Sequence, residues 1–215
     1  MRITICILLG FCFFATSTGQ SQETNRIKEL TVEDAKRLAQ DRSGRLLLNG
    51  LTTLSPEAAK ELARHEGWLS LNGLKSLSNE TAEALTPHRG QLHLDGLTTL
   101  SPEAARSLAK HHGELSLNGL TTPSDEVGVA FAKHTGGRLS LKGLKSLSTE
   151  VGKALAQRKG GGPTHKVCLD GVESLTVEAA TALAETHGHN WDGRLPSMKT
   201  IPWTWPGRSP SDRVD

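Results

Sequence analysis

The sequence predicts an α/β fold, a solenoid of strand-turn-helix units with a parallel sheet on one face and short helices on the other. Two observations predict it: a 23-residue period, and within each period an alternating apolar segment followed by one rich in Ala and Leu. Units this small cannot bury their apolar faces alone, so consecutive copies must pack on each other. Six copies align, at 45–67, 68–90, 91–113, 114–136, 138–160 and 166–188.

Residues 1–19 have the pattern of a secretory signal peptide. Arg2 precedes an apolar run over 3–15, and small or polar residues follow it. The run is too short to span a bilayer comfortably, so we expect no integral membrane insertion of the mature chain, with an uncleaved anchor as the alternative. The pattern predicts an exported protein that is periplasmic, secreted or held at the cell surface.

Residues 20–44 form the next predicted segment. From Ile27 to Gly44 the chain retains only the second, Ala- and Leu-rich half of the unit. A degenerate unit at the end of an array protects the apolar face of its neighbour. We therefore expect residues 20–44 to form an N-terminal cap.

Each full unit begins with a predicted strand and turn. In Leu69-Ser70-Leu71 apolar and polar residues alternate, which is typical of a strand with one buried face. Asn or Asp then precedes a glycine in most units, and the glycine itself occurs in all six. Since glycine tolerates positive φ, we expect turn glycines such as Gly96 to adopt it.

The second half of each unit has the signals of a helix start. Ser55 is followed by Pro56 and Glu57, which is the order of a hydroxyl N-cap, a proline in the first turn and an acid favoured by the helix dipole. Ala58 and Leu62 then fall on one helical face. A short helix is predicted to end near the last glycine of each unit.

The composition changes at residue 189. Residues 189–215 contain three of the four tryptophans and four prolines. The open end of an array needs a cover, so we expect a C-terminal cap. A Trp- and Pro-rich docking peptide is the alternative.

The repeated pattern LxLxGLxxLSxExAxxLA resembles the leucine-rich repeat family, and its spacing is most similar to the 23-residue repeats of bacterial exported proteins. The resemblance implies a solenoid and protein binding. Where the family has an inward asparagine, this sequence has leucine, so we expect the buried asparagine ladder to be absent. The leucines are Leu51, Leu74, Leu97, Leu120 and Leu144.

Charge gives little information about a partner. The 25 Lys and Arg and the 23 Asp and Glu are interspersed. Nucleic-acid binding needs a basic field on one side of the molecule, so we expect no nucleic-acid partner.

Histidines recur at one position of the unit, and we expect a solvated row rather than a metal site. The row is His65, His88, His111 and His134. A second group near the end of the array has metal-ligand residue types but no zinc spacing: His165, Cys168, His187 and His189. We therefore expect no metal and no cofactor.

Catalytic residues are not evident. Cys6 and Cys12 lie in the predicted signal peptide, so Cys168 is the one cysteine of the mature chain, which excludes an internal disulfide. A lone thiol without an evident base is usually passive. The repeated Glu57 position belongs to helix starts. We expect no enzymatic activity.

The outward strand positions remain for function. They form three columns that start at Arg45, Leu47 and Asn49, and one large aromatic, Trp68, stands in the first. Trp68 is either a binding anchor or a cover for the strand with Arg45 stacked on its ring. The predicted binding residues are Trp68, Ser70, Gln91, His93, Asp95 and Glu114.

The sequence thus predicts an exported, non-enzymatic module that binds a protein or glycan ligand through the sheet surface. Two alternatives stay open: a self-associating structural component of the envelope, and a metal-dependent enzyme.

Overall fold

The computed structural model describes residues 24, 26–41, 44–158 and 166–185. The predicted signal peptide and the whole of the C-terminal segment 189–215 lie outside these residues, so the interpretations of both stay predictions. So do the roles of His165, His187 and His189.

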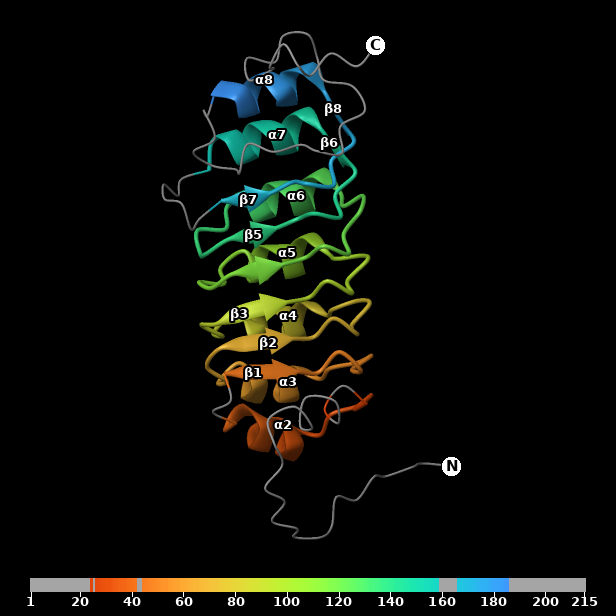
Figure 1. Cartoon of the computed structure of the whole chain (residues 1–215), viewed down its shortest axis with the longest axis vertical. Coiled ribbons are helices and arrows are strands. Elements are labelled where there is room, and N and C mark those ends of the chain that lie inside the picture. The colour runs from red at the N-terminus through yellow and green to blue at the C-terminus, as the bar shows by residue number, and fades with distance from the viewer. Residues whose placement is uncertain (1–23, 25, 42–43, 159–165, 186–215) are drawn as a thin grey trace.

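The described chain alternates short strands and helices in two layers (Figure 1). Six strands pair in parallel in the order β1-β2-β3-β4-β5-β7. They are β1 Arg45–Leu47, β2 Trp68–Ser70, β3 Gln91–His93, β4 Leu115–Ser116, β5 Leu139–Ser140 and β7 Val167–Cys168. The prediction of an α/β fold with a parallel sheet is confirmed.

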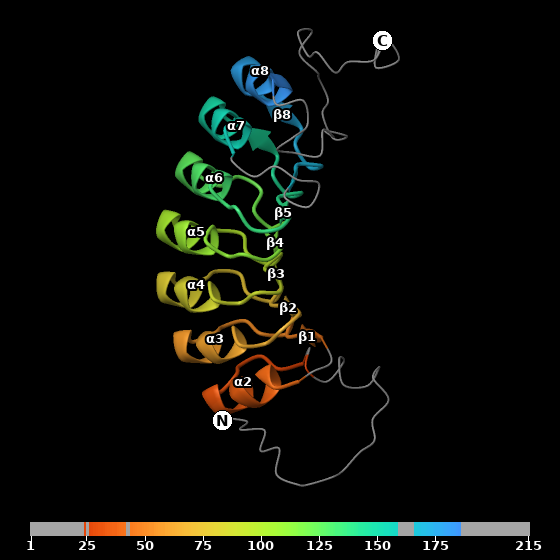
Figure 2. The same ribbon diagram turned by 90° about the vertical axis from the view of Figure 1, so that its left-hand side faces the viewer.

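The helices form the second layer, and each packs against the next. They are α2 Val32–Ala39, α3 Pro56–Leu62, α4 Asn79–Leu85, α5 Pro102–Leu108, α6 Asp125–Ala132, α7 Thr149–Ala156 and α8 Val177–Glu185. In Figure 2 the helices lie on the outer side of a gentle arc and the strands on the inner side. None of these helices has both the length and the apolar character needed to cross a membrane.

A second parallel pair, which the sequence did not predict, joins the last two described units. It consists of β6 Ser146–Leu147 and β8 Ser174–Leu175.

The apolar core lies between the two layers and repeats with the unit. Leu69 on the sheet and Leu62 on α3 are fully buried, as are Ala58 and Ala59. Leucine or valine fills the equivalent strand position in every unit, in register across the sheet. Dry Leu and Ala contacts between consecutive units therefore provide most of the stabilisation.

The helix starts form as predicted. The Ser55 hydroxyl accepts a hydrogen bond from the Ala58 N–H at 3.2 Å, and Pro56 occupies the first turn. Ser78, Ser101 and Ser148 cap their helices in the same way. Thr31 caps α2, so the degenerate unit before residue 45 contributes a regular helix.

The predicted conformation of the turn glycines is wrong. Among the described glycines, Gly44 and Gly67 have positive φ, and Gly96 does not. Gly96 is needed for close approach instead: a Cβ there would overlap the backbone oxygen of Asn72 and lie 2.7 Å from that of Leu74. The turn of one unit thus packs directly on the turn before it.

Candidate functional site

The strands align the predicted columns in register. Arg45 pairs with Trp68 and Trp68 with Gln91 in the first column. The second column is Leu47, Ser70, His93, Ser116, Ser140 and Cys168. Neighbouring residues of one column are thus about 4.8 Å apart, one strand spacing.

The second column is largely closed to ligands, which corrects the predicted role of Ser70. Ser70 and Ser116 are each 3% exposed. The Ser70 hydroxyl donates to Asn49 Oδ1 at 2.6 Å, and the Ser116 hydroxyl donates to Asp95 Oδ1 at 2.6 Å. Small hydroxyl side chains between larger neighbours are covered and engaged in hydrogen bonds.

The third column forms a polar ladder that the sequence analysis did not anticipate. Asn49 Oδ1 accepts the Asn72 N–H, Asn72 Oδ1 accepts the Asp95 N–H, and Asp95 Oδ1 accepts the Asn118 N–H. Asn118 Oδ1 continues it to the N–H of Lys142. The leucine positions do lack an asparagine, but a carboxamide and carboxylate ladder exists two residues before them.

Asp95, a predicted binding residue, belongs to this ladder. Burial opposes its ionisation, but the nearby His93 and the hydrogen bonds from Ser116 and the Asn118 N–H outweigh burial, so the pKa of the carboxyl lies below its usual value. His93 Nδ1 lies 3.7 Å from Asp95 Oδ2. The charge of Asp95 therefore acts chiefly within the sheet.

Trp68 lies in a stack rather than open on the surface. The Arg45 Cζ atom is 4.6 Å from the centre of its ring, and the ring of His93 is 4.3 Å away and nearly parallel. Because β2 lies between β1 and β3, Arg45 and His93 approach the indole from its two sides. Trp68 is half-buried, and neither face of its ring is free.

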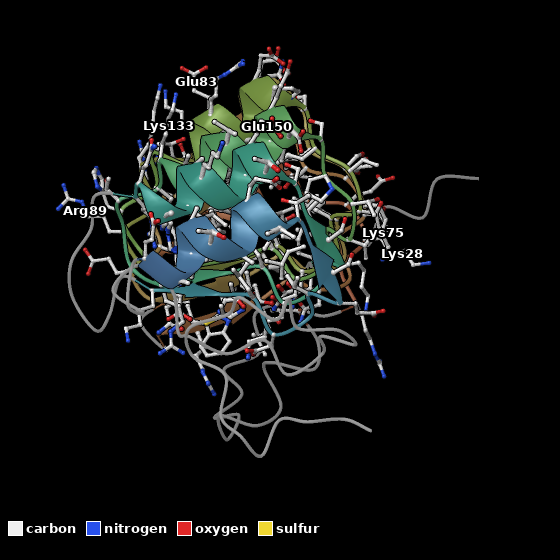
Figure 3. All side chains as sticks on the ribbon, turned by 90° about the horizontal axis from the view of Figure 1, so that it is seen from above. Lys28, Lys75, Glu83, Arg89, Lys133 and Glu150 are labelled. Atoms are coloured by element: carbon white, nitrogen blue, oxygen red, sulfur yellow. The ribbon has the colours of Figure 1, made fainter. Side chains whose placement is uncertain are left out.

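A groove runs along the edge of the sheet that is formed by the N-terminal ends of its strands, and it crosses from one strand to the next. Its volume is about 730 Å³. The first column lines it over five consecutive units, with Arg45, Trp68, Gln91, Glu114 and Arg138. Arg89 adds a third guanidinium, so the groove holds three arginines and one glutamate. In Figure 3 Arg89 projects from this edge, opposite Lys28 and Lys75.

Glycines form the floor of the groove. Gly67, Gly90 and Gly113 line it, and a Cβ on Gly90 or Gly113 would overlap the backbone oxygen of the glycine one unit earlier. The floor is therefore bare backbone. A ligand can approach it more closely than it could approach a row of side chains.

The histidine row lies behind this floor, and its predicted exposure to solvent is wrong. The four residues are at most 1% exposed, and their rings stack at centre distances of 6.5, 5.8 and 6.5 Å. His111 Nε2 lies 3.1 Å from the oxygen of Gly90. The imidazoles thus fill the space between the helix ends and the groove floor.

Burial keeps these imidazoles neutral. Burial first, and the neighbouring His88 second, lower the pKa of His111 to about 4. Burial and the charge of Arg158 lower the pKa of His134 to about 4. The pKa values of His65 and His88 are also lowered, again by burial first. Buried Arg158 follows the row, and its Nε donates to the oxygen of His134 at 2.7 Å.

Metal-binding residues do not gather within the described ranges: there, no group of three or more His, Cys, Asp or Glu is placed to hold an ion. Cys168 is buried and forms no disulfide with another described residue. Of the second predicted group, only Cys168 can be located.

A comparison with protein-family models finds no match to this chain, and a comparison with curated proteins finds no similar sequence.

Proposed function

We propose that this chain is an exported, non-enzymatic binding module, a solenoid similar to leucine-rich repeat proteins, which recognises a protein or glycan through its sheet surface. The groove along the sheet edge carries this proposal. Five consecutive units each contribute a side chain of the first column to it, so it can contact an extended partner at regular intervals.

The side chains that could act as nucleophiles or bases are held in hydrogen bonds within the sheet, which supports binding over catalysis. The hydroxyls of Ser70 and Ser116 donate to the polar ladder, and Asp95 accepts hydrogen bonds within it. Nucleophilic catalysis needs a nucleophile that a base and a substrate can both reach. The groove side chains are instead separate polar groups on a rigid backbone, which suits recognition.

Blocking the groove tests this proposal. Gln91 is exposed at the middle of the groove, so Gln91→Trp fills it with little cost to the fold. Lys60 is exposed on α3, and Lys60→Trp is the matched control on the helix side. We expect the wild-type protein and the control to capture the same partner from an envelope fraction, and Gln91→Trp to lose it. Equal capture by all three proteins would contradict the proposal.

A further inference from the structure

We propose that the groove binds an acidic oligosaccharide with one carboxylate per disaccharide, held by Arg45, Arg89 and Arg138. This inference rests on the proposed binding function and names its ligand class. It follows from the charge, the spacing and the chemistry of the groove.

The groove has an excess of positive charge. Three guanidinium groups and one carboxylate line it. Arg89 and Arg138 are exposed, and within the described residues no ion pair joins either of them to an acid. Arginine binds carboxylates with two parallel hydrogen bonds, and such charge-assisted bonds are stronger than neutral ones.

The arginines recur at every second strand. Arg45 starts β1, Arg89 precedes β3 and Arg138 precedes β5. Arg45 and Arg138 belong to the same column and are four strand spacings apart, about 19 Å. Arg89 lies between them along the groove, in the loop two residues before Gln91. The span from Arg45 to Arg138 is close to the length of two disaccharides in an extended chain, so a glycan that crosses the strands can place carboxylates at both ends of the groove and one near Arg89.

The residues between the arginines suit sugar hydroxyls. Gln91 is exposed between Arg45 and Arg138 and can both donate and accept hydrogen bonds. Glu114 can accept hydrogen bonds from hydroxyl groups. The glycine floor lets a flat sugar chain approach the backbone.

The groove lacks the features that favour a protein partner. Protein interfaces depend on a few aromatic or aliphatic anchors that insert into the partner. Among the described residues that line the groove, Trp68 is the one aromatic, and Arg45 and His93 cover its two faces. An acidic peptide would therefore gain charge contacts but no apolar contact, and we favour the glycan.

Calorimetric titration with a hyaluronan oligosaccharide tests the proposal, since this probe has one carboxylate per disaccharide. We expect the wild-type protein to bind it, and Arg89→Gln/Arg138→Gln to bind it roughly tenfold more weakly or worse. Arg64→Gln/Arg106→Gln removes the same charge from the helix side, where both arginines are exposed and paired with glutamates, and should bind like the wild type. Equal losses in the two double variants would overturn the proposal.

A second variant acts in the opposite direction. Glu114 is the one acid among the described residues that line the groove, so Glu114→Gln should tighten binding of the probe while keeping a hydrogen-bonding side chain. An unchanged or weaker affinity would contradict the carboxylate assignment. Melting temperatures of all variants confirm that each is folded.

Two further probes set the ligand class. A neutral chitin oligosaccharide should not bind, and a polyglutamate peptide should bind more weakly than hyaluronan. Equal or tighter binding of the peptide overturns the glycan assignment, as does no binding of hyaluronan. If Gln91→Trp still abolishes partner capture in that case, the proposed function stands and this inference alone fails.

Discussion

The units up to residue 113 and those after it follow the same pattern but differ in regularity. In the first part each strand has three residues, whereas β4, β5 and β7 have two. The later part also contains the extra β6–β8 pair. Ser124, the N-cap of α6, makes no side-chain capping bond, unlike Ser55 and Ser101.

The two parts also fill their helix faces differently. Ala58 and Ala59 of α3 are replaced in α6 by Val127 and Gly128. A Cβ on Gly128 would lie 2.6 Å from Cγ2 of Val151, which belongs to the next helix. The larger Val127 thus accompanies the loss of a methyl group at residue 128, and the side chain of Val151 occupies the space that this methyl group would need.

The histidine row spans both parts and ends at Arg158. Protonation of this row at low pH should have the largest effect on the free energy of unfolding. Each imidazole has a pKa below the ordinary 6.5, so the unfolded chain binds protons first as pH falls. The contribution of the neutral histidine row to the stability of the folded protein is therefore complete above pH 6.5 and is lost as pH falls to about 4. The loss is about 3 kcal/mol each for His111 and His134, since one pKa unit corresponds to about 1.4 kcal/mol.

Urea unfolding between pH 7 and pH 4 measures this loss. Asp41 and Glu66 face His65 and Arg158 faces His134, so these charges modulate the two ends of the row. His111→Gln removes one titrating group and should flatten the pH dependence while lowering stability at pH 7. A pH dependence equal to that of the wild type would contradict the assignment.

Gly96→Val in the regular part should have the next largest effect. Its Cβ would overlap the backbone of the preceding turn, and no flexible side chain there can move away. We expect a loss of more than about 2 kcal/mol in the free energy of unfolding. Gly128→Ala is the comparison in the irregular part, where the side chain of Val151 can adjust, so its loss should be smaller. Equal losses would show that the turns are no more tightly packed than the helices.

The register, the helix starts and the leucine core could be predicted because each depends on residues close in sequence and on the repeat period. The burial of His88 could not, since a period places a residue at one position of every unit without indicating whether that position faces solvent. One signal existed: glycine follows each histidine of the row by two residues, which indicates a tight loop over the ring.

The site was predicted in part for a similar reason. The alternation of apolar and polar residues along the strand correctly predicted that Trp68 and Ser70 lie outside the leucine core. It could not show that the neighbours of Ser70 cover it, nor that Arg89, in the loop before β3, joins the groove. The covering of Ser70 and the position of Arg89 in the groove both depend on contacts between side chains of different units.

Trp68→Ala should destabilise the regular part moderately. The ring contacts Arg45 on β1 and His93 on β3, so its removal loses packing across three strands. We expect a loss of about 1 to 2 kcal/mol in thermal or urea unfolding. Affinity for the hyaluronan probe should stay close to that of the wild type. Unchanged stability together with a large loss of affinity would establish Trp68 as an anchor instead.

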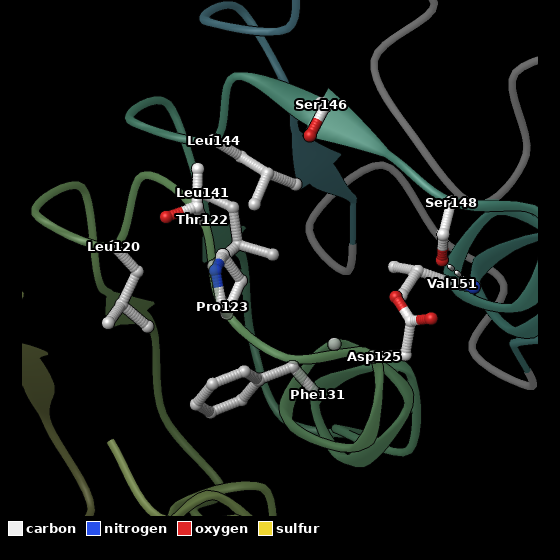
Figure 4. Close-up of a pocket in the computed structure, with 11 residues that line it drawn as sticks. Leu120, Thr122, Pro123, Asp125, Phe131, Leu141, Leu144, Ser146, Ser148 and Val151 are labelled. Atoms are coloured by element: carbon white, nitrogen blue, oxygen red, sulfur yellow. Dashed lines mark hydrogen bonds between the residues drawn. The ribbon is translucent and has the colours of Figure 1, made fainter. Parts of the chain in front are cut away.

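The smallest effect concerns a cavity in the irregular part. Pro123 stands where other units have leucine, and a cavity of about 100 Å³ lies beside it, lined by Phe131, Leu144 and Val151 among others (Figure 4). Pro123→Leu should fill part of this space, and filling a cavity recovers about 24 cal/mol for each Å³. Leucine is also freer than proline in the unfolded chain, which offsets part of the gain.

The net gain expected for Pro123→Leu is therefore about 1 kcal/mol or less, measured by urea unfolding. Thr121→Leu adds a leucine at an exposed position that does not line the cavity, and it should leave stability unchanged. A loss of stability in Pro123→Leu would mean that the rigid backbone of proline, rather than the missing side-chain volume, determines how this unit differs from the regular ones. A gain would make the cavity a local packing defect, which restoration of the repeated leucine largely removes.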